Sequence, residues 1–220
     1  MSKPVFFFLL ALSWFGSAFF ALRAQGEPDR IAIVHGMLLE LAPWHEDLTE
    51  EKATRSDRLH TVARGVVQAA SDATCADGDP GCIKAFGGGR DELEILLVTA
   101  AWWESRLARH VHAGQCRPHE CDRGKSRGLA QVRLTSGVPR ELWEASEGTD
   151  YENTLASMRA AAHVMSRAHW KCFSGDRWHK VFAAYGRGHC SATHQVYARA
   201  SWFQRKLADY RKRLAAGGVE

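Results

Sequence analysis

The chain has 220 residues, of which 45% are hydrophobic and 25% are charged, and its formal net charge is +4. This length and composition suit one globular domain and exclude an intrinsically disordered chain. The mild positive charge suits an anionic polymer as partner. However, no basic run interleaved with aromatic residues indicates a nucleic-acid-binding module, so we expect no nucleic-acid partner.

The first 24 residues are typical of an export segment. Lys3 supplies a positive start, an apolar run follows, and Gly16-Ser17-Ala18 offers the small residues at which signal peptides are cleaved. The apolar run covers residues 4–22, and about 20 residues suffice to cross a bilayer. A cleaved signal peptide is favoured by the small residues, and an uncleaved membrane anchor is the alternative. Both predict that the rest of the chain lies outside the cytoplasm.

Six cysteines fit this location, because an even number in an exported chain favours disulfides. Sequence order suggests three pairs, although other connectivities remain open. The suggested pairs are Cys75 with Cys82, Cys116 with Cys121, and Cys172 with Cys190.

Residues 25–90 are expected to form two accessory helices and a loop. Apolar residues at helical spacing predict a first helix that ends before Pro43 and a second that begins near Ser56. Residues 44–57 are polar and predict a loop. Residues 71–90 are rich in Gly and Asp and also predict a loop; Asp77-Gly78-Asp79 lacks the ligand spacing of a calcium site and indicates a turn.

A helix is predicted from Asp91, which has capping-box spacing to Glu94. Glu104 falls on the apolar face of this helix, near its end. Partial desolvation favours the protonated form of a carboxyl group, and general acid catalysis needs that form. The alternative is a structural role, in which Glu104 pairs with an arginine from elsewhere in the chain.

A cluster of histidines and cysteines follows this helix and suggests zinc as a rival interpretation. Its spacing fits no standard zinc finger, and an oxidising compartment pairs thiols. We therefore expect a disulfide-pinned loop, with no metal. The cluster consists of His110, His112, Cys116, His119 and Cys121.

The remaining chain predicts more helices. It contains no strand-like alternation of useful length, so a small hairpin between Val111 and Val132 is left open and is not indicated by the pattern. Residues 139–145 form a short helix in this interpretation, and Thr149 has capping-box spacing to Glu152. Three long apolar faces follow. They are Leu155, Met158, Ala162 and Met165; Trp178, Val181, Phe182 and Tyr185; and Val196, Ala200, Phe203, Leu207, Tyr210 and Leu214.

Three short motifs occur in a fixed order: Glu104-Ser105, then Gly128-Leu129-Ala130-Gln131-Val132, then Ala183-Ala184-Tyr185-Gly186-Arg187-Gly188. This order resembles the lytic transglycosylases of the lysozyme-like superfamily, whose pattern is Glu-Ser, Gly-Leu-Met-Gln-Ile and Ala-Tyr-Asn-Ala-Gly. Here Ala130 replaces the methionine, and Gly186-Arg187 replaces Asn-Ala.

The resemblance implies a mainly α, lysozyme-like single domain over residues 91–215. It implies that Glu104 is the single catalytic acid/base, that Ser105 and Gln131 line a sugar cleft, and that Tyr185 faces the carboxylate. Ser126 is close enough in sequence to share that wall, and Gly128 is expected to allow a close backbone approach. The implied reaction cleaves the bond between N-acetylmuramic acid and N-acetylglucosamine in peptidoglycan. It gives an anhydro product and needs no cofactor, and we expect a periplasmic or envelope-associated monomer.

Two alternatives remain. A goose-type-like muramidase would use water and needs a carboxylate across the cleft from Glu104; Asp122 and Asp150 are the nearest candidates in sequence. A non-catalytic envelope protein would keep the fold to bind glycan. A closed cleft, or a Glu104 held in a salt bridge, would favour that second alternative.

Overall fold

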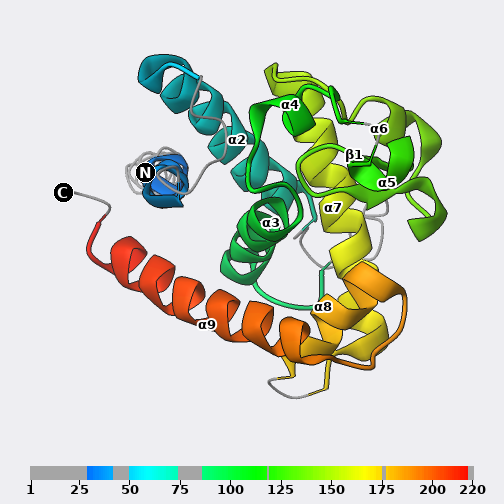
Figure 1. Cartoon of the computed structure of the whole chain (residues 1–220). Coiled ribbons are helices and arrows are strands. Elements are labelled where there is room, and N and C mark those ends of the chain that lie inside the picture. The colour runs from blue at the N-terminus through cyan, green and yellow to red at the C-terminus, as the bar shows by residue number, and fades with distance from the viewer. Residues whose placement is uncertain (1–28, 42–49, 74–85, 118, 175–176, 218–220) are drawn as a thin grey trace, which may run out of the picture.

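The computed structural model describes residues 29–41, 50–73, 86–117, 119–174 and 177–217. These residues form a mainly helical protein, as the sequence predicts (Figure 1). No helix among them is long and apolar enough to cross a membrane. The export segment, the loop with Cys75 and Cys82, and the Asp77-Gly78-Asp79 turn lie outside the described residues.

A helix over residues 29–41 comes first among the described elements. The elements that follow are α2 (Lys52–Ala73), α3 (Arg90–Ser105), α4 (Arg109–His112), α5 (Cys121–Gly124), β1 (Ser126–Arg127), β2 (Val132–Arg133), the short 3-10 helix η2 (Leu134–Ser136), α6 (Arg140–Glu144), α7 (Tyr151–Cys172), α8 (Trp178–Arg187) and α9 (His194–Ala215).

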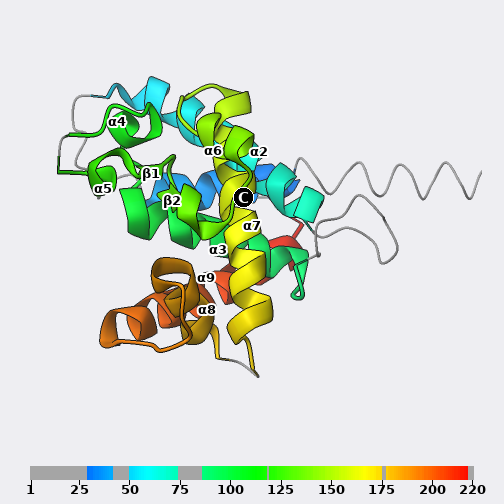
Figure 2. The same cartoon turned by 90° about the vertical axis from the view of Figure 1, so that its right-hand side faces the viewer.

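Helix α3 is the centre of the fold (Figure 1). Its residues from Leu93 to Trp102 are all buried, so the helix is covered on every side over most of its length. Helices α2, α7 and α9 supply that cover. Two groups of shorter elements then project from this centre in both views: α4, α5 and the hairpin form one, and α8 with the start of α9 forms the other (Figure 2).

Helix α2 belongs to the same hydrophobic core as α3 and α7. Leu59, Val62 and Val66 are fully buried there, which confirms the predicted apolar face. The predicted start at Ser56 is wrong, because the helix begins at Lys52. Its first turns are mostly polar because they are largely exposed, so hydrophobic periodicity could not reveal them.

A buried carboxylate joins three helices. Glu94 of α3 has no exposed surface and accepts hydrogen bonds from Arg30 at 2.8 Å, from Arg90 at 3.0 Å and from the Tyr210 hydroxyl. Burial raises the pKa of Glu94, and the three donors act in the opposite direction. The cluster fastens the 29–41 helix and α9 to the central helix.

The predicted capping boxes are both wrong, and for one reason. The N-cap of α3 is Gly89, whose N–H donates to Glu92 at 2.9 Å, while Asp91 pairs with Arg30. The N-cap of α7 is Asp150, which accepts from the Asn153 N–H at 2.9 Å. Both predictions used the spacing of the residues alone. Neighbouring polar residues offer several helix starts with the same spacing, so spacing cannot choose among them.

The later helices and two disulfides confirm their predictions. The faces predicted for α7 and α9 are buried, with Leu214 partly so, and α6 follows directly after Pro139. Cys116 pairs with Cys121 and Cys172 pairs with Cys190, with Cα atoms 6.1 and 5.4 Å apart. The second disulfide connects the end of α7 to the loop that follows α8.

A second buried ion pair supports the start of α2. Both Arg58 and Glu50 are almost fully buried, and Arg58 donates two hydrogen bonds to the Glu50 carboxylate, at 2.9 and 2.8 Å. A third hydrogen bond, at 3.0 Å, goes to the Leu107 carbonyl just beyond α3. Arg58 therefore connects α2 to the chain that leaves the central helix.

We predict that Arg58→Met lowers the free energy of unfolding by about 3 kcal/mol, because the buried Glu50 carboxylate loses both short hydrogen bonds and keeps only a longer ion pair, at 3.7 Å, with Arg55. Arg140→Met is the matched control: the Arg140–Glu144 pair is exposed, and its loss should cost no more than about 0.5 kcal/mol. Urea unfolding of both variants gives the comparison. Equal midpoints for the two would show that the Arg58 pair does not stabilise the fold.

Candidate functional site

The end of α3 is fixed by an unusual turn. Arg106 and Leu107 both have positive φ, at 52° and 56°, so the chain reverses immediately after the helix. The Ser105 hydroxyl donates to the Ala101 carbonyl at 2.8 Å and accepts from the Leu107 N–H at 3.1 Å. These contacts hold the last helical turn, which carries Glu104.

The prediction that Ser105 lines the cleft is wrong. Its side chain is buried, it does not line the cleft described below, and its hydroxyl terminates the helix. A serine at a helix end can bond to backbone groups in its own turn, and here this local use removes the hydroxyl from the cleft.

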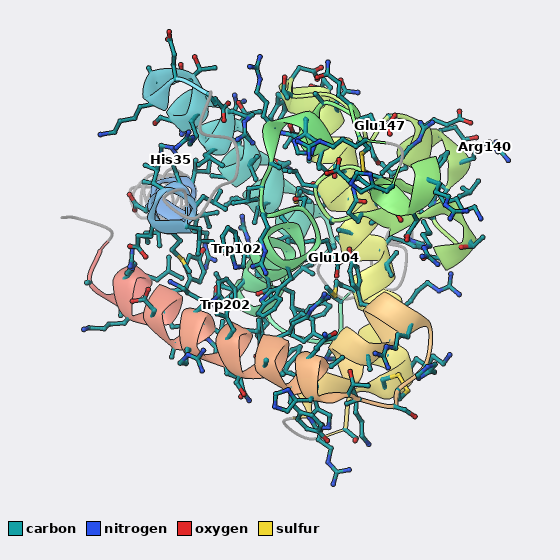
Figure 3. All side chains as sticks on the ribbon, viewed as in Figure 1. His35, Trp102, Glu104, Arg140, Glu147 and Trp202 are labelled. Atoms are coloured by element: carbon teal, nitrogen blue, oxygen red, sulfur yellow. A yellow bond between two sulfur atoms is a disulfide. The ribbon has the colours of Figure 1, made fainter. Side chains whose placement is uncertain are left out.

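Glu104 forms an ion pair with Arg199 of α9 through its Oε1 atom. Figure 3 shows Glu104 near the middle of the molecule, where α3 ends. The two side chains are 23% and 22% exposed. No described residue donates a hydrogen bond to Oε2. Arg199 is not among the described residues that line the cleft, whereas Glu104 is. Among the described residues, the pairing thus leaves Oε2 of Glu104 without a hydrogen-bond donor.

The turn between β1 and β2 brings Gln131 to the same cleft. The two strands pair antiparallel, so the small hairpin that the sequence left open is present. Gly128 has φ +66°, and a Cβ there would lie 2.2 Å from the Ser157 hydroxyl, so only glycine fits, as predicted. Leu129 is buried in the core, while Gln131 lines the cleft and donates to the Gly128 carbonyl at 2.9 Å.

Tyr185 connects α8 to this turn. It lies in the last turn of α8, and its hydroxyl donates to the Ala130 carbonyl. Burial raises the pKa of Tyr185, and the negative charge of Glu104 raises it further. The phenol therefore stays neutral and remains a hydrogen-bond donor.

These three side chains line one open cleft of about 1920 Å³. Glu104 comes from α3, Gln131 from the hairpin and Tyr185 from α8, and residues of α2, α6 and α7 complete the lining. Residues separated by more than 80 positions in the sequence meet there. The prediction for Ser126 is wrong, because its side chain is buried and does not line this cleft.

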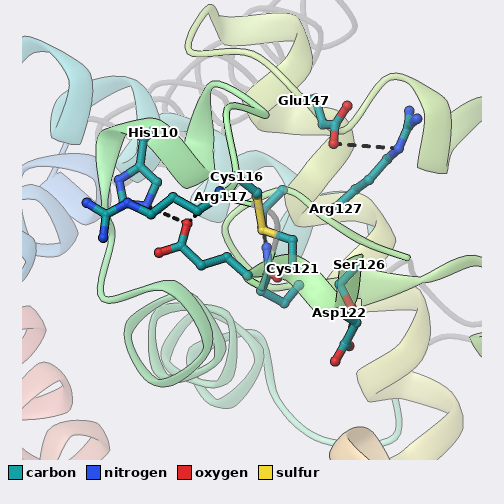
Figure 4. The surroundings of a disulfide bond; sticks show 11 residues. His110, Cys116, Arg117, Cys121, Asp122, Ser126, Arg127 and Glu147 are labelled. Carbon is teal, nitrogen blue, oxygen red and sulfur yellow. Dashed lines mark hydrogen bonds and ion pairs between the residues drawn. A yellow bond between two sulfur atoms is a disulfide. The ribbon is translucent and has the colours of Figure 1, made fainter. Parts of the chain in front are cut away.

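Ser126 instead orients Asp122, which does line the cleft. Figure 4 shows Ser126 beside Asp122, and the Ser126 hydroxyl donates to Asp122 Oδ2 at 2.6 Å. Arg133 donates to the same oxygen at 2.8 and 2.6 Å. The Ser126 hydrogen bond, followed by that of Arg133, lowers the pKa of Asp122, so the carboxylate stays ionised. Asp150 has a different role, as the N-cap of α7.

In the sequence, Asp122 is a candidate only because it lies near Glu104 in the chain. No motif marks Arg133 or Arg199. Asp122 follows the Cys116–Cys121 disulfide directly, and residues 121–123 all have positive φ (Figure 4). A disulfide loop next to the predicted catalytic helix was the available signal. Arg199 carried no signal, because it lies 95 residues from its partner.

Most of the side chains that a zinc site would need have other partners. Cys116 and Cys121 are joined in a disulfide, and His110 contacts Glu120 at 3.1 Å (Figure 4). His112 is fully buried and bonded to the Thr154 hydroxyl at 2.9 Å. Within the described parts of the chain, no group of three His, Cys, Asp or Glu side chains is placed to hold a metal ion.

His112 makes the fold sensitive to acid. Burial lowers its pKa to about 3, and the nearby Arg58 charge acts in the same direction, while Asp150 opposes it. Below a pH of about 6.5 the unfolded chain binds a proton at this position and the folded chain does not, so stability falls as the pH falls towards 3. This group alone should cost roughly 2 kcal/mol between pH 7 and pH 5.

We predict that His112→Gln shows a smaller loss of stability than the wild type between pH 7 and pH 5, as measured by urea unfolding at each pH. His194→Gln is the control, because His194 is exposed at the start of α9 and should keep the wild-type dependence. A pH dependence that is unchanged in His112→Gln would contradict this assignment.

Comparison with known proteins gives no name to this arrangement. No protein-family model, no curated protein and no solved structure matches the chain. The cleft brings together the Glu104 carboxyl group, the ionised carboxylate of Asp122, the neutral phenol of Tyr185 and the amide of Gln131.

Proposed function

We propose that this protein is a peptidoglycan lytic transglycosylase with a lysozyme-like fold. The observation that supports this most is the meeting of three separate motifs in one cleft. Glu104, Gln131 and Tyr185 belong to the three stretches that resemble the family, and all line the same cavity. Chance resemblance of short motifs gives no reason for them to converge in space.

The form of the cleft supports a polymeric substrate. Its volume of about 1920 Å³ exceeds the roughly 300–1,000 Å³ of a pocket for a small molecule. Several sugar units of a glycan strand would fit along it. The lining combines polar side chains with apolar surface, which suits sugars, since their rings have apolar faces and polar edges.

In the proposed reaction Glu104 donates a proton to the glycosidic oxygen as the bond to C1 of the muramyl residue breaks. The resulting carboxylate then takes the proton of the muramyl 6-hydroxyl, whose oxygen attacks C1 and closes the 1,6-anhydro ring. Oε2 is the atom available for both transfers, because Oε1 is held by Arg199. No second carboxylate is required in this route.

The ion pair with Arg199 imposes a condition on this mechanism. An ionised carboxylate only accepts hydrogen bonds and has no proton to donate. The acid step of the proposed route therefore requires the carboxylic acid form of Glu104. Arg199 would meanwhile keep the carboxyl group oriented towards the glycosidic oxygen.

Asp122 supports hydrolysis as a second candidate function. Its ionised carboxylate lines the same cleft as Glu104, which is what a muramidase needs to hold an attacking water. The Arg199 ion pair supports a third candidate, a glycan-binding protein without catalysis, because it occupies the carboxyl group that would act as acid. The two candidates predict different products, or none.

We predict that wild-type protein releases 1,6-anhydro-muropeptides from purified peptidoglycan and that Glu104→Gln lowers this release at least about 100-fold, since the amide cannot transfer the proton. Mass spectrometry of the soluble products measures both. Glu144→Gln is the control, because Glu144 is an exposed glutamate that does not line the cleft. No release by folded, disulfide-bonded wild type would leave the binding protein as the better candidate.

The same assay separates the two enzymes through Asp122→Asn. We predict that the anhydro product persists within about tenfold of the wild-type rate, because the transglycosylase route needs no second carboxylate. Reducing-end products from wild type, lost in Asp122→Asn, would instead assign hydrolysis.

A further inference from the structure

One part of the cleft lining differs in character from the part formed by Glu104, Gln131 and Tyr185. Helix α7 lines it with Arg167, Trp170 and Lys171, and the end of α8 adds Arg187. Positions 167, 170 and 171 share one face of α7, since residues three and four apart are neighbours on a helix. All four side chains are exposed. We call these four residues the basic end of the cleft.

The positive charges at the basic end face no carboxylate among the described residues. Arg167 donates to the Ser136 carbonyl at 3.0 Å, Lys171 donates to the Gly188 carbonyl at 2.8 Å, and Arg187 donates to the Thr193 hydroxyl at 3.2 Å. These acceptors are neutral. They orient the cations but leave their charge uncompensated, and each cation has further N–H donors to offer.

The rest of the described lining shows the opposite arrangement. Each of its three carboxylates has an arginine partner: Asp72 pairs with Arg159, Asp122 with Arg133, and Glu104 with Arg199. The negative charge of the cleft is thus already matched near the proposed reaction site. The remaining positive charge belongs to the basic end, where it can attract an anionic group.

The basic end is also held in shape. The Cys172–Cys190 disulfide follows Lys171 directly and ties α7 to the loop after Arg187. The Lys171 hydrogen bond to Gly188 joins the same two segments. A site whose side chains are already positioned loses less conformational freedom when a ligand binds.

Trp170 adds an apolar surface to this part of the lining. It is 61% exposed, and among the large exposed apolar side chains of the described residues it alone lines the cleft. An exposed indole offers a flat apolar surface, which suits stacking against the apolar face of a sugar ring.

We propose that the basic end is a subsite for a carboxylate-bearing substituent of the glycan. The sugar ring lies against Trp170, and its acidic branch accepts hydrogen bonds from Lys171 and Arg187, with Arg167 alongside. This inference rests on the proposed glycan-cleaving function. It adds that the protein selects strands by the negative charge they carry. The carboxylates can come from the lactyl group of a muramyl residue or from an attached peptide.

The test measures binding without cleavage. Glu104→Gln protein is titrated by calorimetry with three fragments: chitotetraose, which has no carboxylate; a peptide-free tetrasaccharide of alternating N-acetylglucosamine and N-acetylmuramic acid; and the same tetrasaccharide carrying tetrapeptides. Lys171→Gln and Arg187→Gln are each added to this background. Lys212→Gln is the matched control, because Lys212 is an exposed lysine of α9 that does not line the cleft.

We expect each cleft variant to bind a carboxylate-bearing fragment about three- to fivefold more weakly and chitotetraose less than twofold more weakly. A loss with both anionic fragments assigns the lactyl carboxylates, and a loss with the peptide-bearing fragment alone assigns the peptide. An equal loss with chitotetraose, no loss with either anionic fragment, or no binding at all would overturn the subsite. Release of anhydro-muropeptides by wild type is scored separately. Cleavage without charge-dependent binding refutes only the subsite, and charge-dependent binding without cleavage refutes only the enzyme.

Discussion

The structure depends on the hydrogen-bond and ion-pair partners that surround the buried carboxylate of Glu94 in α3. A helix that is buried on almost every side can carry a charge only if the surrounding elements bring partners to it. Arg30 comes from the first described helix, Arg90 from α3 itself and Tyr210 from the last helix. Burial of one carboxylate therefore requires both ends of the described chain to dock on its centre.

Helix α9 links this structural cluster to the cleft. It contributes Tyr210 to Glu94 and Arg199 to Glu104, so one helix supplies a partner to both carboxylates of α3 that matter here. The two carboxylates differ in exposure, because Glu94 is fully buried and Glu104 is 23% exposed. This difference suits a structural role for the first and a chemical role for the second.

The charge of the cleft is arranged along its length. At the proposed reaction site each carboxylate has an arginine beside it, whereas the end formed by α7 and α8 keeps cations with only neutral acceptors. Both disulfides that the structure describes lie next to this arrangement: one precedes Asp122, and the other follows Lys171. The covalent links therefore fix short irregular segments that have few apolar contacts of their own, where burial alone would hold the side chains less firmly.

The sequence by itself determined which segments are helical and which faces they bury. The apolar spacing of α7 and α9 and two of the disulfides could be predicted, because each depends on residues close together in the chain. A glycine at position 128 is expected at a turn, but the close neighbour that excludes a Cβ is Ser157 of α7, which the tertiary structure brings there. Only the tertiary structure decided the start of α2, the use of Ser105 as a helix terminator and the placing of Asp122 in the cleft. It also decided that Arg199 would pair with Glu104, 95 residues away. Periodicity reports how one element is buried, whereas an ion pair depends on how separate elements pack, and that arrangement is fixed only when the whole core closes.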